Sequence, residues 1–296
     1  KKAMSEAREW AACGNVPNLV YDKFRNLEQA IDPTSVITFH DKQYDAASFP
    51  FAKFSSEEKY GWTKGYDLNT GENFHVLADL VYFPYQPTGP YYFYSNSSGC
   101  AARPELEKAI EIATLELIER DSFMCAYLCR LDLPRINFLS LPENIQDRIK
   151  KIERVGFNVH IIDHTLEFAP VCFVFVQHER LGFTACSSCA SFESEYAVSH
   201  ALTEVEAFVY SRLNTSDVPK IKPCEVSDPV GHGMLYAQKA YFRRADFMFE
   251  SRKEISFKDF GKSVSKSWVD LNGVLKNKGY KQIIVPLSLP ESKGGN

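Results

Sequence analysis

The sequence predicts an α+β fold, and two observations support that prediction. Segments with a helical period and segments typical of strands follow one another in the order helix, strands, helix, strands, helix, strand. This order lacks the strict alternation of strand and helix that a doubly wound parallel sheet requires. The chain also has 296 residues, of which 45% are hydrophobic, so it can bury a large core.

The composition excludes several classes of protein. With 24% charged and 14% aromatic residues, the chain has the composition of a globular protein and not of a disordered one. A net charge of −4 and a pI near 6.0 give no electrostatic basis for general nucleic-acid binding. No apolar run approaches the roughly 18 residues that cross a bilayer. Charge and apolar runs thus lead us to expect no nucleic-acid or membrane partner. Eight cysteines over this length do not indicate a disulfide framework, so we expect a cytoplasmic protein.

The first third of the chain is expected to hold two helices, one strand and one hairpin. Helices are predicted at 3–12 and 23–31, and "SVITFH" (35–40) is predicted to be a strand. The segment 62–85 is predicted to be a hairpin, because apolar stretches flank the turn signal "LNTGEN". The opening "KKAMSEAREWAA" has the pattern of a helix interior and no leader, so we expect the sequence to begin inside a longer protein.

The longest helix is predicted from about Pro104 to Leu128. Pro104 suits a first helical turn, and the glutamates that follow it suit the positive end of the helix dipole. A second amphipathic helix ends at Gly156. The remaining predicted elements are strands at 157–165, 169–179, 181–189 and 281–286, and helices at 194–213, 233–248 and 265–278.

Two pairs of glutamates stand three residues apart on predicted helices. They are Glu6 with Glu9 and Glu116 with Glu119, and Glu204 lies in the similar context "ALTEVEAF". Residues three apart share one helix face, where like charges repel. A magnesium ion would turn this repulsion into a binding site, because it takes carboxylate oxygens and leaves room for phosphates. The alternative is a solvated helix face, which we expect for Glu111.

Other patterns that could carry chemistry are weaker. Cys186-x-x-Cys189 has no second cysteine pair, so ordinary thiols are favoured over a zinc site. His160 and His164 stand four apart in a predicted strand, where they would share a face. The segment "SNSSG" lacks the lysine of a P-loop, and no G-x-S-x-G motif is present.

The central segment "YSNSSGCAARPELEKAIEIATLELIERDSF" resembles the core signature of the YcaO family. "KAMSEAREWAA" is similar to an earlier S-E-x-x-E-R helix of that family, and "SCASFESEYAVSHALTEVEAFVYSR" to a later signature helix. "KQIIVPLSLP" resembles the strand that leads to the family's C-terminal region. The resemblance follows the chain in order over nearly its whole length and implies one catalytic domain over 1–296, shortened at both ends.

The resemblance implies mixed sheets with helices that line a central ATP and magnesium site. Its metal ligands would be Glu6, Glu9, Glu116, Glu119 and Glu204. Nucleotide contacts would come from Ser95, Ser98, Glu107 and Arg120. The catalytic residues would be Glu116, Glu119 and Arg120. Four positions depart from the family's pattern, namely Trp10, Ser98, Arg103 and Ala207.

The activity implied by the resemblance is ATP-dependent cyclodehydration of a ribosomally made precursor peptide. A Cys, Ser or Thr side chain would attack a backbone carbonyl, and the product would be a thiazoline or an oxazoline. The expected partners are the precursor, a leader-binding protein, a dehydrogenase subunit and a second copy of the chain. Formation of a backbone thioamide is the alternative reaction, and a non-catalytic scaffold is the alternative from another class.

Overall fold

The computed structural model describes residues 2–215, 218–226 and 228–289. Within it the chain divides into two compact units, which are described separately. Unit 1 comprises Lys1–Thr114 with Leu275–Asn296, and unit 2 comprises Leu115–Val274.

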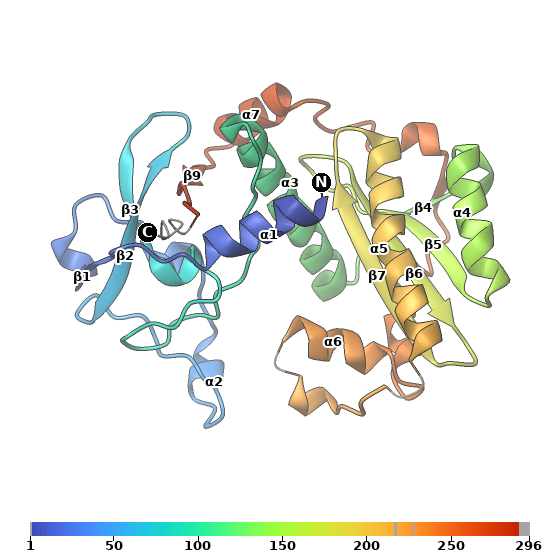
Figure 1. The fold of residues 1–296 in the computed structure, drawn as a ribbon, viewed down its shortest axis with the longest axis horizontal. Coiled ribbons are helices and arrows are strands. Elements are labelled where there is room, and N and C mark those ends of the chain that lie inside the picture. The colour runs from blue at the N-terminus through green and yellow to red at the C-terminus, as the bar shows by residue number, and fades with distance from the viewer. Residues whose placement is uncertain (1, 216–217, 227, 290–296) are drawn as a thin grey trace, which may run out of the picture. The chain divides into compact units, whose positions relative to one another are not determined.

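Unit 1 is built around a four-stranded antiparallel sheet (Figure 1). Its strands are β1 (Val20–Lys23), β2 (Lys59–Asp67), β3 (Asn73–Leu77) and β9 (Ile283–Ile284). β2 and β3 form the predicted hairpin, in which Trp62 pairs with Leu77. Asp67 fixes the turn by accepting hydrogen bonds from the backbone of Asn69 at 2.7 Å and Thr70 at 3.0 Å. The hairpin prediction is confirmed.

The core of unit 1 is aromatic. Tyr60, Trp62 and Tyr92 are at most 3% exposed, and Phe54 stacks on Tyr60 with ring centroids 5.1 Å apart. Among the described residues, the α-helices that lie wholly in this unit are α1 (Lys2–Cys13), as predicted, and the single turn α2 (Asp41–Tyr44). Three short 3-10 helices, η1 (Phe24–Asn26), η2 (Pro33–Ser35) and η3 (Ala78–Leu80), complete it.

Two predictions for unit 1 are wrong. The helix expected at 23–31 is the end of β1 followed by a 3-10 turn, because pairing of β1 with β2 outweighs the local helical preference. Gln29 has a φ of +52°, which a right-handed helix does not allow. The strand expected at 35–40 is absent from this described segment. Asp32 instead caps a 3-10 turn, accepting a 2.9 Å hydrogen bond from the backbone of Thr34.

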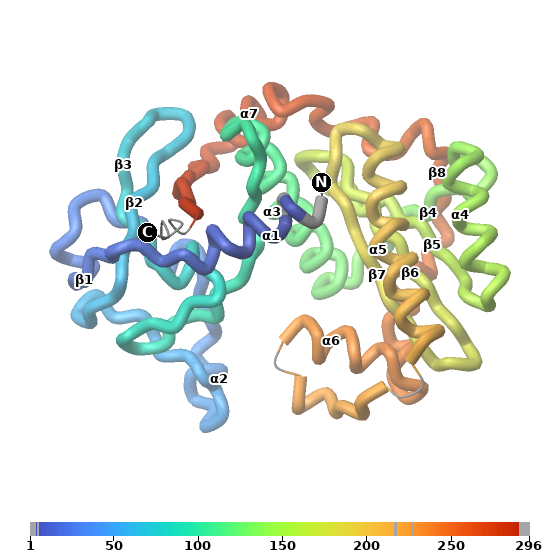
Figure 2. The backbone as a smooth tube through the Cα atoms, viewed as in Figure 1, coloured from blue at the N-terminus to red at the C-terminus, as the bar shows by residue number. Residues whose placement is uncertain are grey.

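Unit 2 contains a five-stranded mixed sheet in the order β7-β6-β5-β4-β8. The three longest strands, β5 (Asn158–Asp163), β6 (Val171–His178) and β7 (Phe183–Ala190), are antiparallel and confirm the predicted strands. Two short strands were not predicted, β4 (Arg135–Ile136) and β8 (Glu254–Ile255), and they run parallel at the far edge of the sheet (Figure 2). β7 forms the other edge.

One face of this sheet is covered by α4 (Glu143–Arg154) and α5 (Ser194–Asn214), and α5 crosses β6 and β7 (Figure 1). Ile145, Ile149 and Ile152 follow a helical period on α4 and are at most 4% exposed, so they build the core with β6. Gly156 ends this segment with a φ of +92°. Both helices confirm the prediction.

The other face of the sheet meets the later turns of α3 (Leu106–Cys129), the long helix that was predicted. The ring of Phe123 stacks on Phe173 of β6, with centroids 5.3 Å apart. The same face contacts η6 (Phe242–Met248), where Gln177 donates a 2.8 Å hydrogen bond to Asp246. The later turns of α3 therefore lie against this sheet, and Glu119 contacts β7.

The helix predicted at 233–248 is two elements, α6 (Pro229–Tyr236) and η6, because Tyr241 leaves the helical region with φ −128° and ψ −17°. The helix predicted at 265–278 is α7 (Trp268–Asn277), and the strand predicted at 281–286 is reduced to β9. Short 3-10 helices lie at η4 (Phe138–Ser140), η5 (Pro223–Glu225) and η7 (Phe257–Asp259). No helix in the described ranges combines the length and apolarity needed to cross a bilayer.

Candidate metal and nucleotide site

Three of the predicted site residues occupy one stretch of α3 in unit 2. The guanidinium Nη2 of Arg120 lies 3.5 Å from Oε1 of Glu116, one helical turn away. The side chain of Glu116 is 26% exposed and that of Arg120 is 57% exposed. Glu119 is half-buried and points toward the sheet. The helix thus carries two carboxylates and a solvent-accessible cation within five residues.

Glu119 is fixed by the edge strand β7. The hydroxyl of Ser188 donates a 2.5 Å hydrogen bond to Oε1, and the backbone N–H of Ala190 donates a 3.1 Å hydrogen bond to Oε2. An edge strand presents backbone N–H groups without a strand partner, and Glu119 satisfies one of them. Both carboxylate oxygens are therefore held in place by neutral donors.

Glu204 reaches the same point of β7 from α5. The hydroxyl of Ser187 donates a 2.6 Å hydrogen bond to Oε2 of Glu204, and Nε2 of His200 lies 3.5 Å from Oε1. Consecutive strand residues point to opposite faces, so Ser187 faces α5 and Ser188 faces α3. The structure thus brings Glu119 and Glu204 to adjacent residues of one edge strand, from its two sides.

Cys186 lies on the α3 face of β7, two residues before Ser188. Burial raises the pKa of its thiol to about 12, and the nearby Arg120 guanidinium opposes that shift. The thiol is therefore neutral at physiological pH. Cys189 points to the opposite face because it is three residues away, so the two cysteines do not form a shared zinc site.

The two histidines considered as metal ligands pack against aromatic rings. His160 stacks on Phe249 with centroids 4.4 Å apart, and His164 stacks on Phe173 at 4.2 Å. His164 is fully buried, and neither ring nitrogen has a hydrogen-bond partner among the described residues. Both side chains belong to the core and not to a metal site.

The other predicted residues lie in unit 1. Glu6 is exposed and Glu9 half-buried on α1, three residues apart as expected. Ser95 is half-buried and accepts a 3.2 Å hydrogen bond from the backbone N–H of Tyr85, and Ser98 is exposed. Glu107 is exposed in the first turn of α3.

Glu111 was expected to be a surface residue. Its side chain is only 14% exposed and pairs with Lys108 at 2.6 Å. The expectation of a solvated carboxylate at Glu111 was therefore wrong.

The donor chemistry of these residues fits magnesium. Carboxylate oxygens are the protein ligands that this ion takes, and partial exposure leaves room for water and phosphate oxygens. Among the described residues, no group of three or more His, Cys, Asp or Glu side chains lies close enough together to hold a metal ion. The described site therefore supplies oriented single carboxylates and not a preassembled cage.

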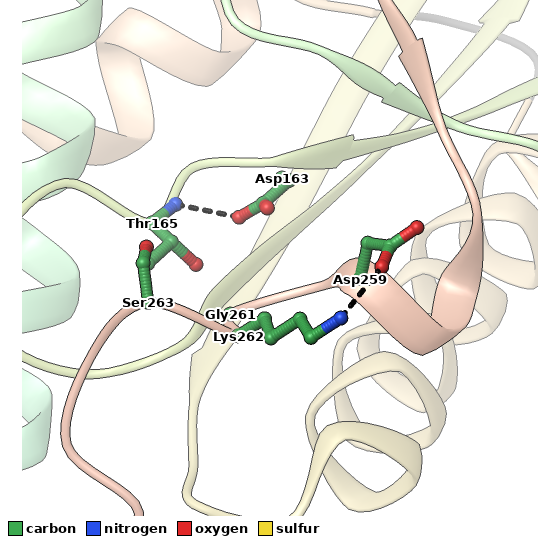
Figure 3. A pocket seen from close by; sticks show the side chains of 6 residues that line it. All are labelled: Asp163, Thr165, Asp259, Gly261, Lys262 and Ser263. Atoms are coloured by element: carbon green, nitrogen blue, oxygen red, sulfur yellow. Dashed lines mark hydrogen bonds and ion pairs between the residues drawn. The ribbon is translucent and has the colours of Figure 1, made fainter.

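A cavity of about 320 Å³ lies elsewhere in unit 2, and none of the predicted residues line it. Figure 3 shows its lining, formed by Asp163, Thr165, Asp259, Gly261, Lys262 and Ser263. Burial raises the pKa of Asp163, and hydrogen bonds from Thr165 oppose the shift. Since Asp163 accepts a 2.8 Å hydrogen bond from the backbone of Thr165, it holds the loop that follows β5.

Sequence reasoning missed Ser187, Ser188 and His200. The available signal was the dipeptide of two serines inside the strand pattern "FTACSSCA", where a buried strand otherwise favours apolar residues. A hydroxyl that is removed from water needs a hydrogen-bond partner, and the buried Ser187 and the half-buried Ser188 each donate to a glutamate.

These features define an α+β protein in which helices on both faces of a mixed sheet bring carboxylates to one edge strand. A family model described as YcaO cyclodehydratase, ATP- and Mg²⁺-binding, matches residues 2–294. The chain therefore belongs to the YcaO family. The predicted family and α+β fold are confirmed, and ATP and magnesium are the cofactors that the family's description gives.

Solved structures share the fold. The heterocyclase TruD superposes with a TM-score of 0.72 at 18% identity, over 95% of this chain and 42% of TruD. The YcaO protein from Methanopyrus kandleri, bound with AMPPCP and Mg²⁺, gives 0.63 at 18% identity, over 93% of this chain and 65% of that one. A chain of the E. coli microcin synthetase McbBCD complex superposes with a TM-score of 0.68 at 14% identity, over 93% of this chain and 71% of that one. No curated protein sequence matches the chain.

The chain spans only about two fifths of the length of TruD. At these identities the likeness shows the fold and not the activity.

Proposed function

We propose that this chain is an ATP- and magnesium-dependent peptide cyclodehydratase acting on a ribosomally made precursor peptide. The observation that carries the proposal is the fixation of Glu119 and Glu204 on adjacent residues of β7, beside Glu116 and Arg120. Membership of a family described as cyclodehydratases supports it.

The reaction we propose joins a side-chain nucleophile of the peptide to a backbone carbonyl carbon. The nucleophile gives up its S–H or O–H proton as it bonds to that carbon. The carbonyl oxygen takes the γ-phosphoryl group of ATP and leaves as phosphate, while the amide nitrogen loses its proton and forms the C=N bond. The peptide loses the elements of one water, and the products are an azoline, ADP and phosphate. ATP is thus a substrate that removes oxygen from the peptide.

The residues of this chain contribute position and charge. Arg120 is suited to phosphate oxygens because its planar guanidinium offers donors in a fixed geometry. Its ion pair with Glu116 is long and partly exposed, so Arg120 can exchange that partner for a phosphate. Phosphoryl transfer depends mainly on such positioning and charge neutralisation.

Magnesium, when bound, would neutralise phosphate charge and orient the nucleotide. In unit 2 we propose Glu116, Glu119 and Glu204 as individual carboxylate ligands, since they form no preassembled cage among the described residues. In unit 1 we propose Glu6 and Glu9 as further ligands. Ser95, Ser98 and Glu107 are proposed nucleotide contacts, and all of these assignments rest on the match to the family's signatures.

The departures from the family pattern bear on the alternative of a non-catalytic scaffold. Trp10 is 53% exposed and packs edge-on against Phe83 with ring centroids 5.3 Å apart, so it offers an aromatic contact where the family pattern has an arginine. Ala207 is exposed on α5 and contributes no donor to the site. A scaffold has no need for carboxylates that are fixed by hydroxyls of an edge strand, and this favours catalysis.

A direct assay tests the proposal. The purified chain, a leader-binding partner and a precursor peptide from the same gene neighbourhood are incubated with ATP and Mg²⁺, and the peptide is weighed by mass spectrometry. We expect the loss of one water for each modified Cys, Ser or Thr, with release of one phosphate. Replacement of oxygen by sulfur would assign thioamide formation instead. An unmodified peptide without ATP turnover, with all partners present, would assign a scaffold.

A further inference from the structure

We propose that Ser187 and Ser188 are positioning residues that orient Glu204 and Glu119 for metal binding, so that one dipeptide of β7 sets the magnesium affinity of the site. This inference rests on the proposed function, because it assumes that each of the two glutamates is a magnesium ligand. It adds two residues that touch neither metal nor nucleotide and act through the carboxylates.

The geometry at Ser188 leaves the carboxylate of Glu119 available for a further ligand. Ser188 occupies Oε1 at 2.5 Å and the Ala190 backbone occupies Oε2 at 3.1 Å. Each carboxylate oxygen accepts two hydrogen bonds or ligands, so one lone pair remains on each atom. The two donors fix the plane of the carboxylate and the direction of those lone pairs.

Ser187 holds the carboxylate of Glu204 from the other face of the sheet. Ser187 is 8% exposed, and its hydroxyl donates to Oε2 of Glu204 at 2.6 Å. His200 lies 3.5 Å from the other oxygen, Oε1. Glu204 is thus tied to the strand through one oxygen and to its own helix through the other.

Packing alone does not account for two serines at this position. The neighbouring strand β6 is buried along its whole length with mainly apolar side chains, and a buried hydroxyl is unfavourable without a partner. Alanine or cysteine would fill the strand equally well. The two hydroxyls are explained by the carboxylates, one on each face.

Hydrogen bonds of this kind tune a metal ligand. Groups that orient a ligating side chain typically change metal affinity by about 10- to 100-fold when they are removed. They do so by holding the ligand in one rotamer, which lowers the conformational entropy lost on binding. We therefore expect Ser188→Ala and Ser187→Ala each to weaken magnesium binding by about that factor.

The test measures binding and not turnover. The full chain is titrated calorimetrically with Mg²⁺ in the presence of AMPPCP. Thermal unfolding in EDTA reports the structural effect of each variant separately. Ser251→Ala is the matched control, because Ser251 is also buried and donates a 2.6 Å hydrogen bond to a carboxylate of the same unit, that of Asp132. We expect Ser251→Ala to bind Mg²⁺ with unchanged affinity.

A pair of isosteric variants separates the hydroxyl from the shape of the side chain. Ser188→Thr retains the donor and should bind Mg²⁺ nearly as the natural chain does, whereas Ser188→Val should not. This comparison tests the role of the Ser188 hydroxyl even if Ser188→Ala fails to fold. Ser188→Ala should also add nothing to Glu119→Gln, because Ser188 acts only through that carboxylate.

The outcomes distinguish the two proposals. If Glu119→Gln and Glu204→Gln both bind Mg²⁺ normally, the metal assignment of the proposed function is wrong. If they lose binding while Ser187→Ala and Ser188→Ala retain it, the glutamates are ligands and the positioning role is wrong. Equal binding by Ser188→Thr and Ser188→Val would also overturn it.

Discussion

Arg120 and Glu116 form an ion pair one helical turn apart on α3, with 3.5 Å between Nη2 and Oε1. The arginine is 57% exposed, whereas the glutamate is 26% exposed. A pair of this kind contributes only a few tenths of a kcal/mol to a helix. The residue that was predicted to contact phosphate is therefore held close to a predicted metal ligand by an interaction weak enough to exchange.

Replacing Arg120 should separate activity from stability. Arg120→Ala is expected to lower the rate of ATP turnover by about 100-fold or more, because a charge that stabilises the transferred phosphoryl group is lost. The free energy of unfolding should change by less than about 0.5 kcal/mol, since the pair is exposed. Phosphate release and urea unfolding measure the two effects.

Two further variants control that prediction. Arg120→Lys keeps the charge without the planar donors, so it should recover only part of the turnover. Lys108→Ala removes another ion pair of the same helix, at 2.6 Å to Glu111, in which the lysine is 52% exposed, and should leave turnover unchanged. Normal turnover by Arg120→Ala would contradict the phosphate role.

The glutamates of α3 should differ in their structural cost. Glu116→Gln and Glu119→Gln are both expected to abolish ATP turnover. Glu119→Gln should also destabilise the chain by about 1 kcal/mol, because a side-chain amide cannot accept both hydrogen bonds that Ser188 and Ala190 donate. Glu116→Gln should leave stability within about 0.5 kcal/mol. Turnover and chemical denaturation check each variant, and full activity in both would contradict the metal assignment.

The fold could be predicted where local periodicity and tertiary packing agree. α4 carries its three buried isoleucines at helical spacing, and β6 is a continuous apolar run, so both were found with nearly correct bounds. The short strands β1, β4 and β8 are defined only by their pairing partners, for example Val20 with Trp62. A sequence of two to four residues carries no period from which to infer them.

In the candidate site, too, local spacing could be predicted and long-range contacts could not. Residues three and four apart on one helix, such as Glu116, Glu119 and Arg120, could be grouped from helical geometry alone. The approach of α5 to the opposite side of β7 is a long-range contact. It joins Glu204 to Ser187 and could not be derived from spacing. The sequence pattern predicts only that the two serines lie in a strand, although their hydroxyls donate hydrogen bonds to both carboxylates.

Arg148 is expected to stabilise the packing of α4 on α5. Its guanidinium binds Glu206 bidentately, with Nε–Oε1 at 2.8 Å and Nη2–Oε2 at 2.9 Å, and donates to Ser199 and Thr203, each at 2.8 Å. Arg148→Lys should lower the free energy of unfolding by about 1–3 kcal/mol, because an ammonium cannot reproduce this fork. Urea denaturation measures the loss. The exposed pair of Lys150 and Asp147 is the control, and Lys150→Ala should change stability by less than about 0.5 kcal/mol.

Asp79 should make the stability of the chain fall as the pH rises. Its side chain is 2% exposed, and it accepts no hydrogen bond from another described residue. Burial raises its pKa from 3.8 to about 6. The folded state then binds more protons than the unfolded state between these values, so the stabilisation is complete below pH 3.8 and lost through about pH 6.

Asp79→Asn should remove this loss. We expect the variant to gain stability relative to the natural chain between pH 4 and pH 7, by up to about 3 kcal/mol, the equivalent of the pKa shift. Thermal unfolding from pH 4 to pH 8 measures the difference. Asp41→Asn is the control, because Asp41 is exposed and its pKa is lowered by Lys53. A difference curve for Asp79→Asn that is flat with pH would contradict the prediction.

His164 should make the stability of the chain fall as the pH decreases. It is fully buried against Phe173, and burial lowers its pKa from 6.5 to about 3. Between these values the unfolded state binds the extra proton, so stability is complete above pH 6.5 and falls with decreasing pH by up to about 1.4 kcal/mol per pH unit. His164→Phe keeps the stacked ring without a titrating nitrogen, and it should abolish this component. Above pH 7 both side chains are neutral, so the difference measured there isolates the change in packing. Parallel curves for the two proteins from pH 7 to pH 4 would show that His164 is not the titrating group.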